Sequence, residues 1–549
     1  MASRSYSQAP VGWDLPGLAL EAWPPTLNTV GVAQMAEVLT PFVLARRWYR
    51  SKAKHLQSAR IHDILTAPGE EWSIVLLEFE YEECDCEIYL CTVAAAFGEA
   101  RDRVFGEYPE SAIARIALSD GSIGVLYEAI GNRSFSDALL AAVAREVTLE
   151  GAAGHLSAWR TKTFQQIVGT HQPILCARVS KAEQSNSSIF YGDRFILKIF
   201  RKLDAGINPD FEIGQFLTGR GFRYTPAVAG HIEYREAQSE PMLAGILQQF
   251  VPNQGDAWEF TLGSAREFYA KTRNRIAPRL ISGHPMEENG PQSAAEARRI
   301  IGTYIDSAQL LARRTAEMHI ALTDSKGGPE FAPEPFTEEF RIALHGRLIR
   351  QMDLSLRLIR EKQASFESRV AADAQKLLDL EPRIRERFRQ VCENPVHAMR
   401  IRHHGDYHLG QVLWTGNDFA IIDFEGEPAR SLEERRIKRS AMRDVAGMLR
   451  SFQYAAYFAL PAEGSAADER RTLETEAWAE YWNASVGRAF LSSYLAVAGG
   501  QAFVPDDTRE RRLLLDVFVL EKALYEVAYE LNNRPHWVRI PLRGILLIS

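Results

Sequence analysis

The chain has 549 residues, of which 46% are hydrophobic and 25% are charged, and its formal net charge is −7. This composition is typical of an ordinary globular protein with several domains or lobes, and it argues against a disordered chain. The negative charge and the absence of a long basic run argue against nucleic acid or an anionic membrane as the main partner, so a small neutral or cationic ligand fits better.

The sequence predicts a cytoplasmic protein. Its apolar runs are too short to span a bilayer, and the N-terminus, with Arg4, Pro10 and Trp13, lacks the apolar segment of a signal peptide. The five cysteines are odd in number and show no spacing typical of disulfides or a metal site. We therefore expect a reducing compartment in which the cysteines are packing residues.

The chain before Gly121 is predicted to form a small α+β unit. A short helix is expected over Val32 to Leu39, ahead of Pro41, and strands are expected over Trp72 to Phe79 and Glu87 to Val93. This unit should pack onto the lobe that follows it.

The next chemical feature is Lys198, which lies in the second of two β-type runs separated by small polar residues. A lysine among apolar strand residues needs a partner, and in a nucleotide site that partner is a phosphate. Hydroxyl and backbone groups of the intervening loop would bind the other phosphates. The loop candidates are Ser185, Asn186, Ser187 and Ser188. Taken alone, the pattern also fits a solvent-facing edge lysine beside a serine-rich turn.

Glu212 is the predicted partner of Lys198. It lies in a helix that Asn208-Pro209-Asp210 begins, and it would fix the orientation of the lysine. The alternative is an acid that is merely favoured by the dipole of the helix N-terminus.

An apolar strand then leaves its sheet near Gln249 and Val251 and enters a turn with proline and glycine. In a two-lobed kinase this segment is the hinge, where backbone groups of both residues would meet the adenine edge. Asp256 would take a ribose hydroxyl, or it is an ordinary turn aspartate.

The most informative stretch runs from His404 to Pro428 and contains two aspartates. Gln411 to Trp414 and Phe419 to Ile422 read as strands of a hairpin, which brings Asp406 and Asp423 to one end of it. Metal-assisted phosphoryl transfer needs such a pair, because one carboxylate orients the attacking hydroxyl and the other holds magnesium. This interpretation also favours the phosphate role of Lys198.

Two alternatives exist for the same stretch. His403, His404 and His408 raise the question of a zinc site, but Gly405 disfavours a regular helix and no cysteine or further histidine cluster follows at metal-ligand spacing. The second alternative is a polar loop with a purely structural role.

The C-terminal helix is predicted to carry the site for the acceptor. Its core side is an apolar stripe with spacings of three and four residues, made of Leu513, Val517, Leu520, Leu524, Val527 and Leu531. The opposite face mixes aromatic rings with hydrogen-bonding groups, as sugars require, and a solvated amphipathic helix is the alternative. The acceptor candidates are Lys522, Tyr525, Glu526 and Trp537.

Five segments carry a family resemblance that covers nearly the whole chain. They are Arg47 to Lys52, Leu311 to Leu322, His404 to Gln411, Asp423 to Pro428 and Arg443 to Arg450. Together they resemble the bacterial maltokinases, which are eukaryotic-like kinases related to aminoglycoside phosphotransferases.

The resemblance implies a bilobal, eukaryotic-protein-kinase-like α+β fold. Its implied parts are an N-terminal cap subdomain over residues 1–120, a nucleotide-binding N-lobe over 121–248 and a mostly helical C-lobe over 249–549. The implied activity is transfer of the γ-phosphate of ATP to the anomeric hydroxyl of maltose, giving maltose 1-phosphate for α-glucan synthesis. ATP and Mg²⁺ are the implied cofactors, and trehalose synthase is an implied partner.

Within this analogy Asp406 is the catalytic base, Asp423 is the main magnesium ligand and Gln411 is the second ligand. Aminoglycoside kinases usually carry asparagine in place of Gln411 and often a small residue near Glu425, and both departures match the maltokinases. His408 and Glu425 are placed on the acceptor side, although Glu425 could also reach the metal or pair with Arg430.

Two other functions compete with maltose phosphorylation. One is a glucosamine kinase or another sugar kinase that shares the nucleotide half, which an acceptor panel would separate. The other is a catalytically silent, kinase-like partner of trehalose synthase. The presence of Lys198, Asp406 and Asp423 together disfavours the silent partner.

Overall fold

The computed structural model divides the chain into two compact units. The first unit contains the chain up to Gln215 together with Pro226–Val251, and the second contains Phe216–Thr225 and the chain from Pro252 onward. The described residues are 15–82, 86–169, 175–180, 186–273, 275–278, 284–287, 291–324, 327–428, 430–460 and 469–548.

The first unit opens with a seven-stranded sheet in which β12 pairs with β4 beside the strand order β1-β5-β6-β4-β3-β2. Its strands are β1 (Gly17–Leu20), β2 (Leu56–Leu65), β3 (Trp72–Tyr81), β4 (Cys86–Phe97), β5 (Ala112–Leu118), β6 (Ile123–Glu128) and β12 (Lys202–Leu203). Because β6 pairs with both β4 and β5, this sheet extends past residue 120, where the cap was predicted to end.

Helix α1 (Val32–Leu44) is longer than predicted because it continues through Pro41. A proline removes one helical hydrogen bond, which favours an end to the helix. Met35, Leu39 and Val43 lie on the buried side of α1 and join the core of the first sheet. Packing of the last turn therefore outweighs the lost bond.

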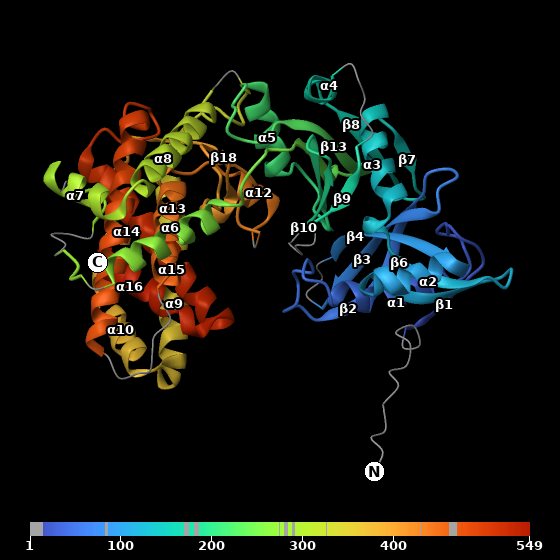
Figure 1. The fold of residues 1–549 in the computed structure, drawn as a ribbon, viewed down its shortest axis with the longest axis horizontal. Helices are drawn as coiled ribbons and strands as arrows, with labels where there is room; N and C mark the ends of the chain where they lie inside the picture. Colours follow the sequence, from blue (N-terminus) through green and yellow to red (C-terminus); the bar gives the residue numbers. More distant parts are fainter. Residues whose placement is uncertain are drawn as a thin grey trace, which may run out of the picture. The chain divides into compact units, whose positions relative to one another are not determined.

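A second seven-stranded sheet follows in the order β7-β8-β13-β14-β11-β10-β9. Its strands are β7 (Thr148–Glu150), β8 (Gly154–Arg160), β9 (Ala177–Val179), β10 (Asn186–Tyr191), β11 (Phe195–Phe200), β13 (Val228–Glu236) and β14 (Met242–Gln249). Helices α2 (Gly98–Glu107), α3 (Arg133–Arg145) and α4 (Lys162–Val168) complete the unit (Figure 1).

The two sheets share one hydrophobic core. Trp72 and Leu76 from the first sheet, Phe135 from α3, and Leu197 and Ile246 from the second sheet belong to the same buried cluster. A shared core means that the N-terminal sheet cannot move as an independent domain without exposing apolar surface.

The second unit is mostly helical, and its helices run from green to red in Figure 1. Helix α5 (Pro209–Gly219) begins in the first unit and ends in the second. The helices described after it are α6 (Ala257–Thr272), α7 (Pro291–Ile301), α8 (Tyr304–Ala321), α9 (Glu338–Lys362), α10 (Ser368–Asp379), α11 (Glu381–Glu393), α12 (Leu432–Arg436), α13 (Met442–Phe458), α14 (Glu469–Ala498), α15 (Thr508–Asn533) and α16 (Arg539–Ile548). Among the described helices, none has the length and apolar character that crossing a membrane requires.

Two short antiparallel strand pairs lie among the helices. Strand β15 (Glu334–Pro335) pairs with β16 (Met399–Arg400), and β17 (Val412–Trp414) pairs with β18 (Phe419–Ile421). The second pair confirms the predicted hairpin between the two aspartates.

Candidate active site

A buried aspartate fixes the backbone of the loop that carries Asp406. The Asp444 carboxylate, in the first turn of α13, accepts hydrogen bonds from the backbone N–H groups of His404 (2.7 Å) and Gly405 (3.0 Å). His319 Nε2 on α8 lies 3.0 Å from the same carboxylate. Burial acts to raise the pKa of Asp444, but the surrounding histidines outweigh it and hold the pKa well below its usual range. Asp444 is therefore ionised at neutral pH, and its bonds hold this loop in one conformation.

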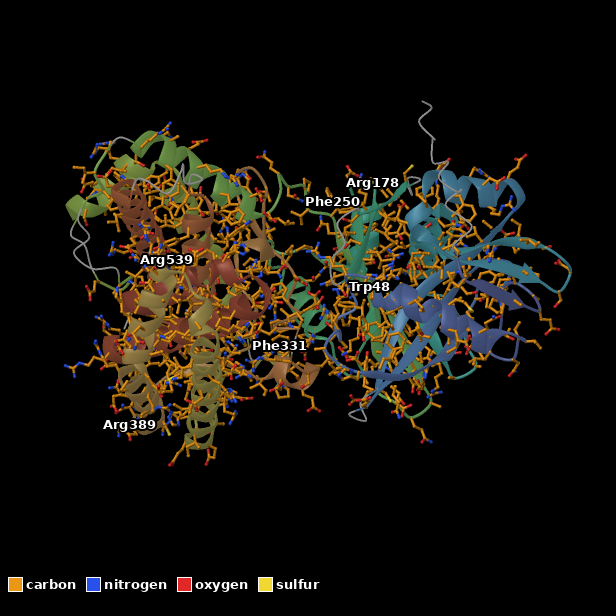
Figure 2. All side chains as sticks on the ribbon, turned by 90° about the horizontal axis from the view of Figure 1, so that it is seen from below. Trp48, Arg178, Phe250, Phe331, Arg389 and Arg539 are labelled. Carbon is orange, nitrogen blue, oxygen red and sulfur yellow. The ribbon has the colours of Figure 1, made fainter. Side chains whose placement is uncertain are left out.

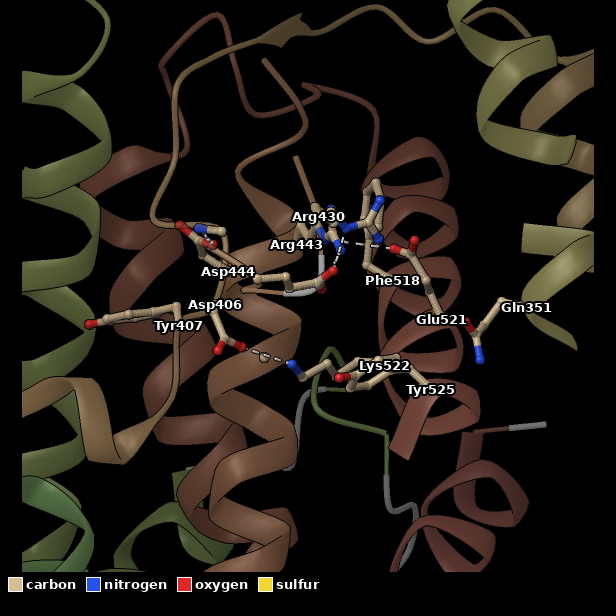
Figure 3. A pocket seen from close by; sticks show the side chains of 13 residues that line it. Gln351, Asp406, Tyr407, Arg430, Arg443, Asp444, Phe518, Glu521, Lys522 and Tyr525 are labelled. Carbon is tan, nitrogen blue, oxygen red and sulfur yellow. Dashed lines mark hydrogen bonds and ion pairs between the residues drawn. The ribbon is translucent and has the colours of Figure 1, made fainter. Parts of the chain in front are cut away.

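The Asp406 carboxylate lies between a lysine and a histidine. Lys522 Nζ lies 3.1 Å from Oδ1 (Figure 3). His408 Nε2 lies 4.0 Å from Oδ2. Burial acts to lower the pKa of Lys522, but Asp406 and Glu427 raise it above its usual range. Burial lowers the pKa of His408. At neutral pH a charged ammonium group therefore faces one oxygen of Asp406, and a neutral imidazole is near the other.

Asp406 lines a pocket of about 440 Å³, including its open mouth. Arg443 ties two acids of the wall together, because its Nη2 donates to Glu427 at 2.7 Å and its Nε lies 3.8 Å from Glu521. Burial acts to raise the pKa of Glu427, but Arg443 and other nearby cations lower it to about 2. Tyr525 adds an aromatic ring to the lining (Figure 3). The pocket thus offers charged donors, acceptors and an apolar ring face, which together suit a sugar.

Asp423 follows the β17–β18 hairpin with its backbone in the left-handed region, at φ 68°. This conformation costs a non-glycine residue roughly 1–2 kcal/mol, and such strain gathers at functional sites. Close packing explains the shape of the turn, because a Cβ placed on Gly405 would lie 3.1 Å from the Cα of Gly426. The loop that carries Asp406 and the turn after Asp423 are therefore packed backbone against backbone.

The residues around this turn suit a hard metal ion. Asp423 and Glu425 have carboxylate oxygens within 4.8 Å of one another. Gln411 lies beside them in the hairpin, since its carbonyl accepts the N–H of Ile422 at 3.0 Å. Oxygen donors of this kind are the ligands that Mg²⁺ prefers, so these residues fit the predicted ion. Arg430, one predicted partner of Glu425, donates its Nε–H to Glu427.

The histidines of the zinc alternative take part in packing the loop. His404 Nε2 lies 2.9 Å from the carbonyl of Ile422, and His408 Nδ1 accepts the N–H of Gly410 at 3.1 Å. These assignments disfavour a zinc site.

In the first unit, Lys198 on β11 pairs with Asp210. Its Nζ lies 2.8 Å from Asp210 Oδ2, and the side chain of this aspartate is only 1% exposed. The sequence interpretation chose Glu212 and treated Asp210 only as part of a helix start. Asn208 explains the geometry, because its side chain accepts the N–H of Asp210 at 2.9 Å and thereby fixes the first turn of α5.

The predicted phosphate-binding loop is partly a strand. Asn186, Ser187 and Ser188 belong to β10 and pair with Phe200, Ile199 and Lys198 of β11. Pairing with an apolar partner strand overrides the weak strand preference of these small polar residues. Ser185 lies outside the described residues.

The hinge candidates lie at the end of β14. The N–H of Gln249 donates to the carbonyl of Ala227 at 2.8 Å, and Val251 is the last residue of the first unit. Asp256 caps α6, because its side chain accepts the N–H of Glu259 at 2.9 Å. This bond gives Asp256 a structural role in the turn, while its contact with a ribose and the adenine contacts of Gln249 and Val251 stay predictions.

Helix α15 buries part of the face that was expected to be polar. Lys522 and Tyr525 line the pocket, but Glu526 is only 9% exposed and its carboxylate lies 2.6 Å from Arg450 Nη2. Trp537 lies beyond the end of α15 and packs against Phe458, with ring centroids 5.0 Å apart. Glu526 and Trp537 are thus outside the described lining of the pocket. Helical spacing alone could not show that Arg450 of α13 stands opposite Glu526.

Several residues of the site received no role from the sequence. Asp444 and Arg443 lie in a segment that carried the family resemblance, and Glu427 follows Asp423 closely. The available signal was an arginine-aspartate pair at the start of an apolar helix. Glu521 gave no signal of its own, because a charged residue on a long helix is usually solvated.

No family model matches the chain. A glucosamine kinase of Streptacidiphilus jiangxiensis is 24% identical over 427 residues, which are 77% of this chain and 83% of that protein. A glucosamine kinase of Mycolicibacterium smegmatis is 23% identical over 364 residues, which are 65% of this chain and 76% of the relative.

Solved structures agree with these relatives. A glucosamine kinase in complex with glucosamine, ADP and inorganic phosphate superposes with a TM-score of 0.59 at 18% identity, covering 93% of this chain and 98% of the other. A further crystal form of glucosamine kinase gives a TM-score of 0.60 over 92% of this chain. The chain has the glucosamine kinase fold. This confirms the predicted bilobal, kinase-like α+β fold and supports a kinase related to the aminoglycoside phosphotransferases, whereas the narrower assignment to maltokinases stays a prediction.

Proposed function

We propose that the protein is an ATP-dependent sugar kinase in which Asp406 accepts the proton of the attacking hydroxyl. The observation that carries this proposal is the ion pair of Asp406 with Lys522 in the wall of a polar pocket. Kinase relatives over most of the chain support the same reaction class.

In this proposal the acceptor oxygen forms a bond to the γ-phosphorus of ATP while the bond from that phosphorus to the bridging oxygen breaks. The hydroxyl proton moves to Asp406 Oδ2, because Lys522 already occupies Oδ1. Lys522 places a positive charge near the reacting oxygens. Asp423, Glu425 and Gln411 would hold Mg²⁺, which when bound neutralises charge on the phosphates.

The first candidate acceptor is an amino sugar of the glucosamine type. Two relatives and a neighbouring structure carry that name, and they span most of this chain. The pocket chemistry is compatible, since its lining holds four carboxylates and three basic side chains. The excess of acid favours an acceptor with an ammonium group.

Maltose is the second candidate, and one observation favours it. Tyr525, in the pocket lining, stacks with the exposed ring of Tyr529 at a centroid distance of 6.3 Å. A second glucose unit could lie on such an extended aromatic surface. With maltose as acceptor, the proposal extends to trehalose synthase as a partner, which co-purification of the two proteins would test.

An acceptor panel tests the proposal. The full chain with ATP and Mg²⁺ is offered glucosamine, glucose, maltose and an aminoglycoside, and NMR identifies the phosphorylated position. A higher kcat/KM for glucosamine than for maltose supports the first candidate, and the reverse supports the second. Nucleotide binding without any phosphorylated product would overturn the proposal and favour the silent kinase-like partner.

A further inference from the structure

Buried acids of the N-terminal sheet hold the chain directly after the strand that carries Lys198. Arg201 follows β11 and is only 2% exposed, and Lys202 begins β12 on the edge of β4. Both basic residues lie between Lys198 and its partner Asp210 in the sequence. Their contacts therefore bear on both members of this pair.

Arg201 connects the two sheets through one guanidinium group. Its Nη1 lies 3.3 Å from Glu128 Oε1 on β6, and its Nε donates to Ser187 Oγ on β10 at 2.8 Å. Its backbone carbonyl accepts the N–H of Leu90 at 2.8 Å. The guanidinium also lies over the ring of Trp48, 5.2 Å from the centroid, and Figure 2 labels Trp48 in the first unit.

Glu87 on β4 holds Lys202 in a second cluster. Lys202 Nζ lies 3.1 Å from Glu87 Oε1, and the carboxylate accepts hydrogen bonds from the hydroxyls of Ser51 (2.7 Å), Tyr81 (2.8 Å) and Tyr89 (2.8 Å). Burial acts to raise the pKa of Glu87, but these bonds and the lysine lower it to about 2. The segment Arg47 to Lys52, which had no assigned function, thus supplies Trp48 to one cluster and Ser51 to the other.

Only the Arg201 cluster joins the two sheets, because the Glu87 cluster lies within the first sheet. Burying charged groups in either cluster carries a desolvation penalty. The free energy lost by desolvating an ion pair can equal the Coulomb attraction gained by forming it. Apolar residues of similar volume often stabilise a core more than such a pair does. The sheets already share an apolar core. The polar clusters fix an orientation that apolar contacts do not. A planar guanidinium group that makes hydrogen bonds with several partners can do so in only one orientation.

We propose that the N-terminal sheet is part of the phosphate-donor half of the site, with Arg201 as the positioning residue that sets the geometry of Lys198 and Asp210. This inference rests on the proposed kinase function. Ser187, bonded to Arg201, is adjacent in β10 to Ser188, which pairs with Lys198. The β10–β11 hairpin cannot shift along the sheet without breaking the buried contacts of Arg201.

The test compares isosteric variants of the full chain. Glu128→Gln removes the charge opposite Arg201, and Ser187→Ala removes its acceptor on β10. The matched control is Glu78→Gln on β3 of the same N-terminal sheet. This variant removes the charge that pairs with Arg60 and His62 on β2. Hydrogen exchange of the β10 and β11 amides is measured without nucleotide, and KM for ATP and for the sugar is measured in the same preparations.

We expect faster exchange in β10 and β11 in both test variants and near-native exchange in the control. KM for ATP should rise about tenfold, the equivalent of one lost hydrogen bond to a charged group, while KM for the sugar stays constant. Unchanged exchange in β10 and β11, or an equal rise of KM for ATP in Glu78→Gln, would overturn the inference. If the wild-type chain bound no ATP, the kinase proposal would fall, and the exchange data would still decide whether Arg201 anchors the hairpin.

Discussion

Two buried carboxylates, Asp444 in the helical unit and Glu87 in the β-rich unit, hold chain segments next to proposed functional side chains, but they do so through different partners. Asp444 binds the backbone N–H groups of His404 and Gly405. Glu87 binds side chains, including that of Lys202. A bond to the backbone fixes the path of a loop whichever side chains it carries, whereas a bond to a side chain leaves the backbone some freedom.

This difference matches the tasks of the neighbouring residues. In the proposed reaction Asp406 must place an oxygen within hydrogen-bonding distance of the reacting hydroxyl, and misplacement by about 1 Å can cost two orders of magnitude in rate. Lys198 would act on phosphate mainly through charge, and Coulomb attraction falls off more gently with distance. Rigid backbone anchoring is therefore found where the chemistry is more sensitive to position.

The largest effect is expected for Asp406→Asn. This variant tests whether the loop that Asp444 holds serves to position a proton acceptor. An amide cannot accept the proton, so kcat should fall by about 10²–10⁴. ATP affinity should change little, because the donor contacts lie elsewhere. Steady-state kinetics and calorimetric ATP titration give the two values. Near-native turnover would show that the ordered loop serves some other residue.

Asp444→Asn tests backbone anchoring directly. The asparagine presents an NH₂ group where two backbone N–H groups need acceptors, so we expect the free energy of unfolding to fall by about 3 kcal/mol or more. Turnover should fall as well, since the loop that carries Asp406 loses its fixed path. Urea denaturation and kcat measured in one preparation test both effects.

The control is Asp516→Asn in α15. Asp516 is also buried, and its carboxylate pairs with His284 at 2.7 Å rather than with the catalytic loop. This variant should lose stability and retain the kcat of its folded fraction. If both variants lost kcat alike, the loss at Asp444 would reflect general destabilisation and the comparison of the two anchors would fail.

The same difference explains what the sequence could predict. The β17–β18 hairpin and the aspartates at its end were predicted, because strand and turn signals are local. The contacts of Asp444 were not predicted. Every residue except proline has a backbone N–H group, so the identities of the bound residues do not indicate which acceptor they meet. The pairing of Asp210 with Lys198 was not predicted, since choosing among the acids of one helical turn requires the orientation of the helix. The pairing of Glu212 with Lys198 stays a prediction. Glu526 was expected on the exposed face of its helix. Its ion pair with Arg450 could not be predicted, because the two residues are distant in sequence.

Glu87→Gln tests anchoring through side chains and should show a distinctive pH dependence. The folded-state pKa is lowered to about 2, so the stability that Glu87 contributes is complete above the ordinary pKa of 4.5 and is lost as the pH falls toward 2. The wild type should exceed the variant by about 2–3 kcal/mol at pH 7, and the difference should vanish near pH 2. Denaturation at pH 7, 4 and 2.5 gives the curve.

The matched control for this curve is Glu78→Gln. Glu78 has a lowered pKa too, but it lies on the partly exposed side of the sheet beside Arg60, so its effect should be smaller. A constant difference between wild type and Glu87→Gln at every pH would mean that the carboxylate charge is not what holds Lys202.

The smallest expected effect separates backbone strain from metal binding at Asp423. The loop that Asp444 holds packs against the turn at Gly426, and Asp423 in this turn has a left-handed conformation. Asparagine tolerates that conformation and alanine does not, so Asp423→Ala should be less stable than Asp423→Asn by about 1 kcal/mol. Both variants should lose magnesium-dependent ATP binding, because neither retains the carboxylate. Equal stability of the two variants in urea would show that the turn adopts another conformation in solution. In that case Asp444 would fix the loop that carries Asp406 but not the turn that contains the proposed metal ligands.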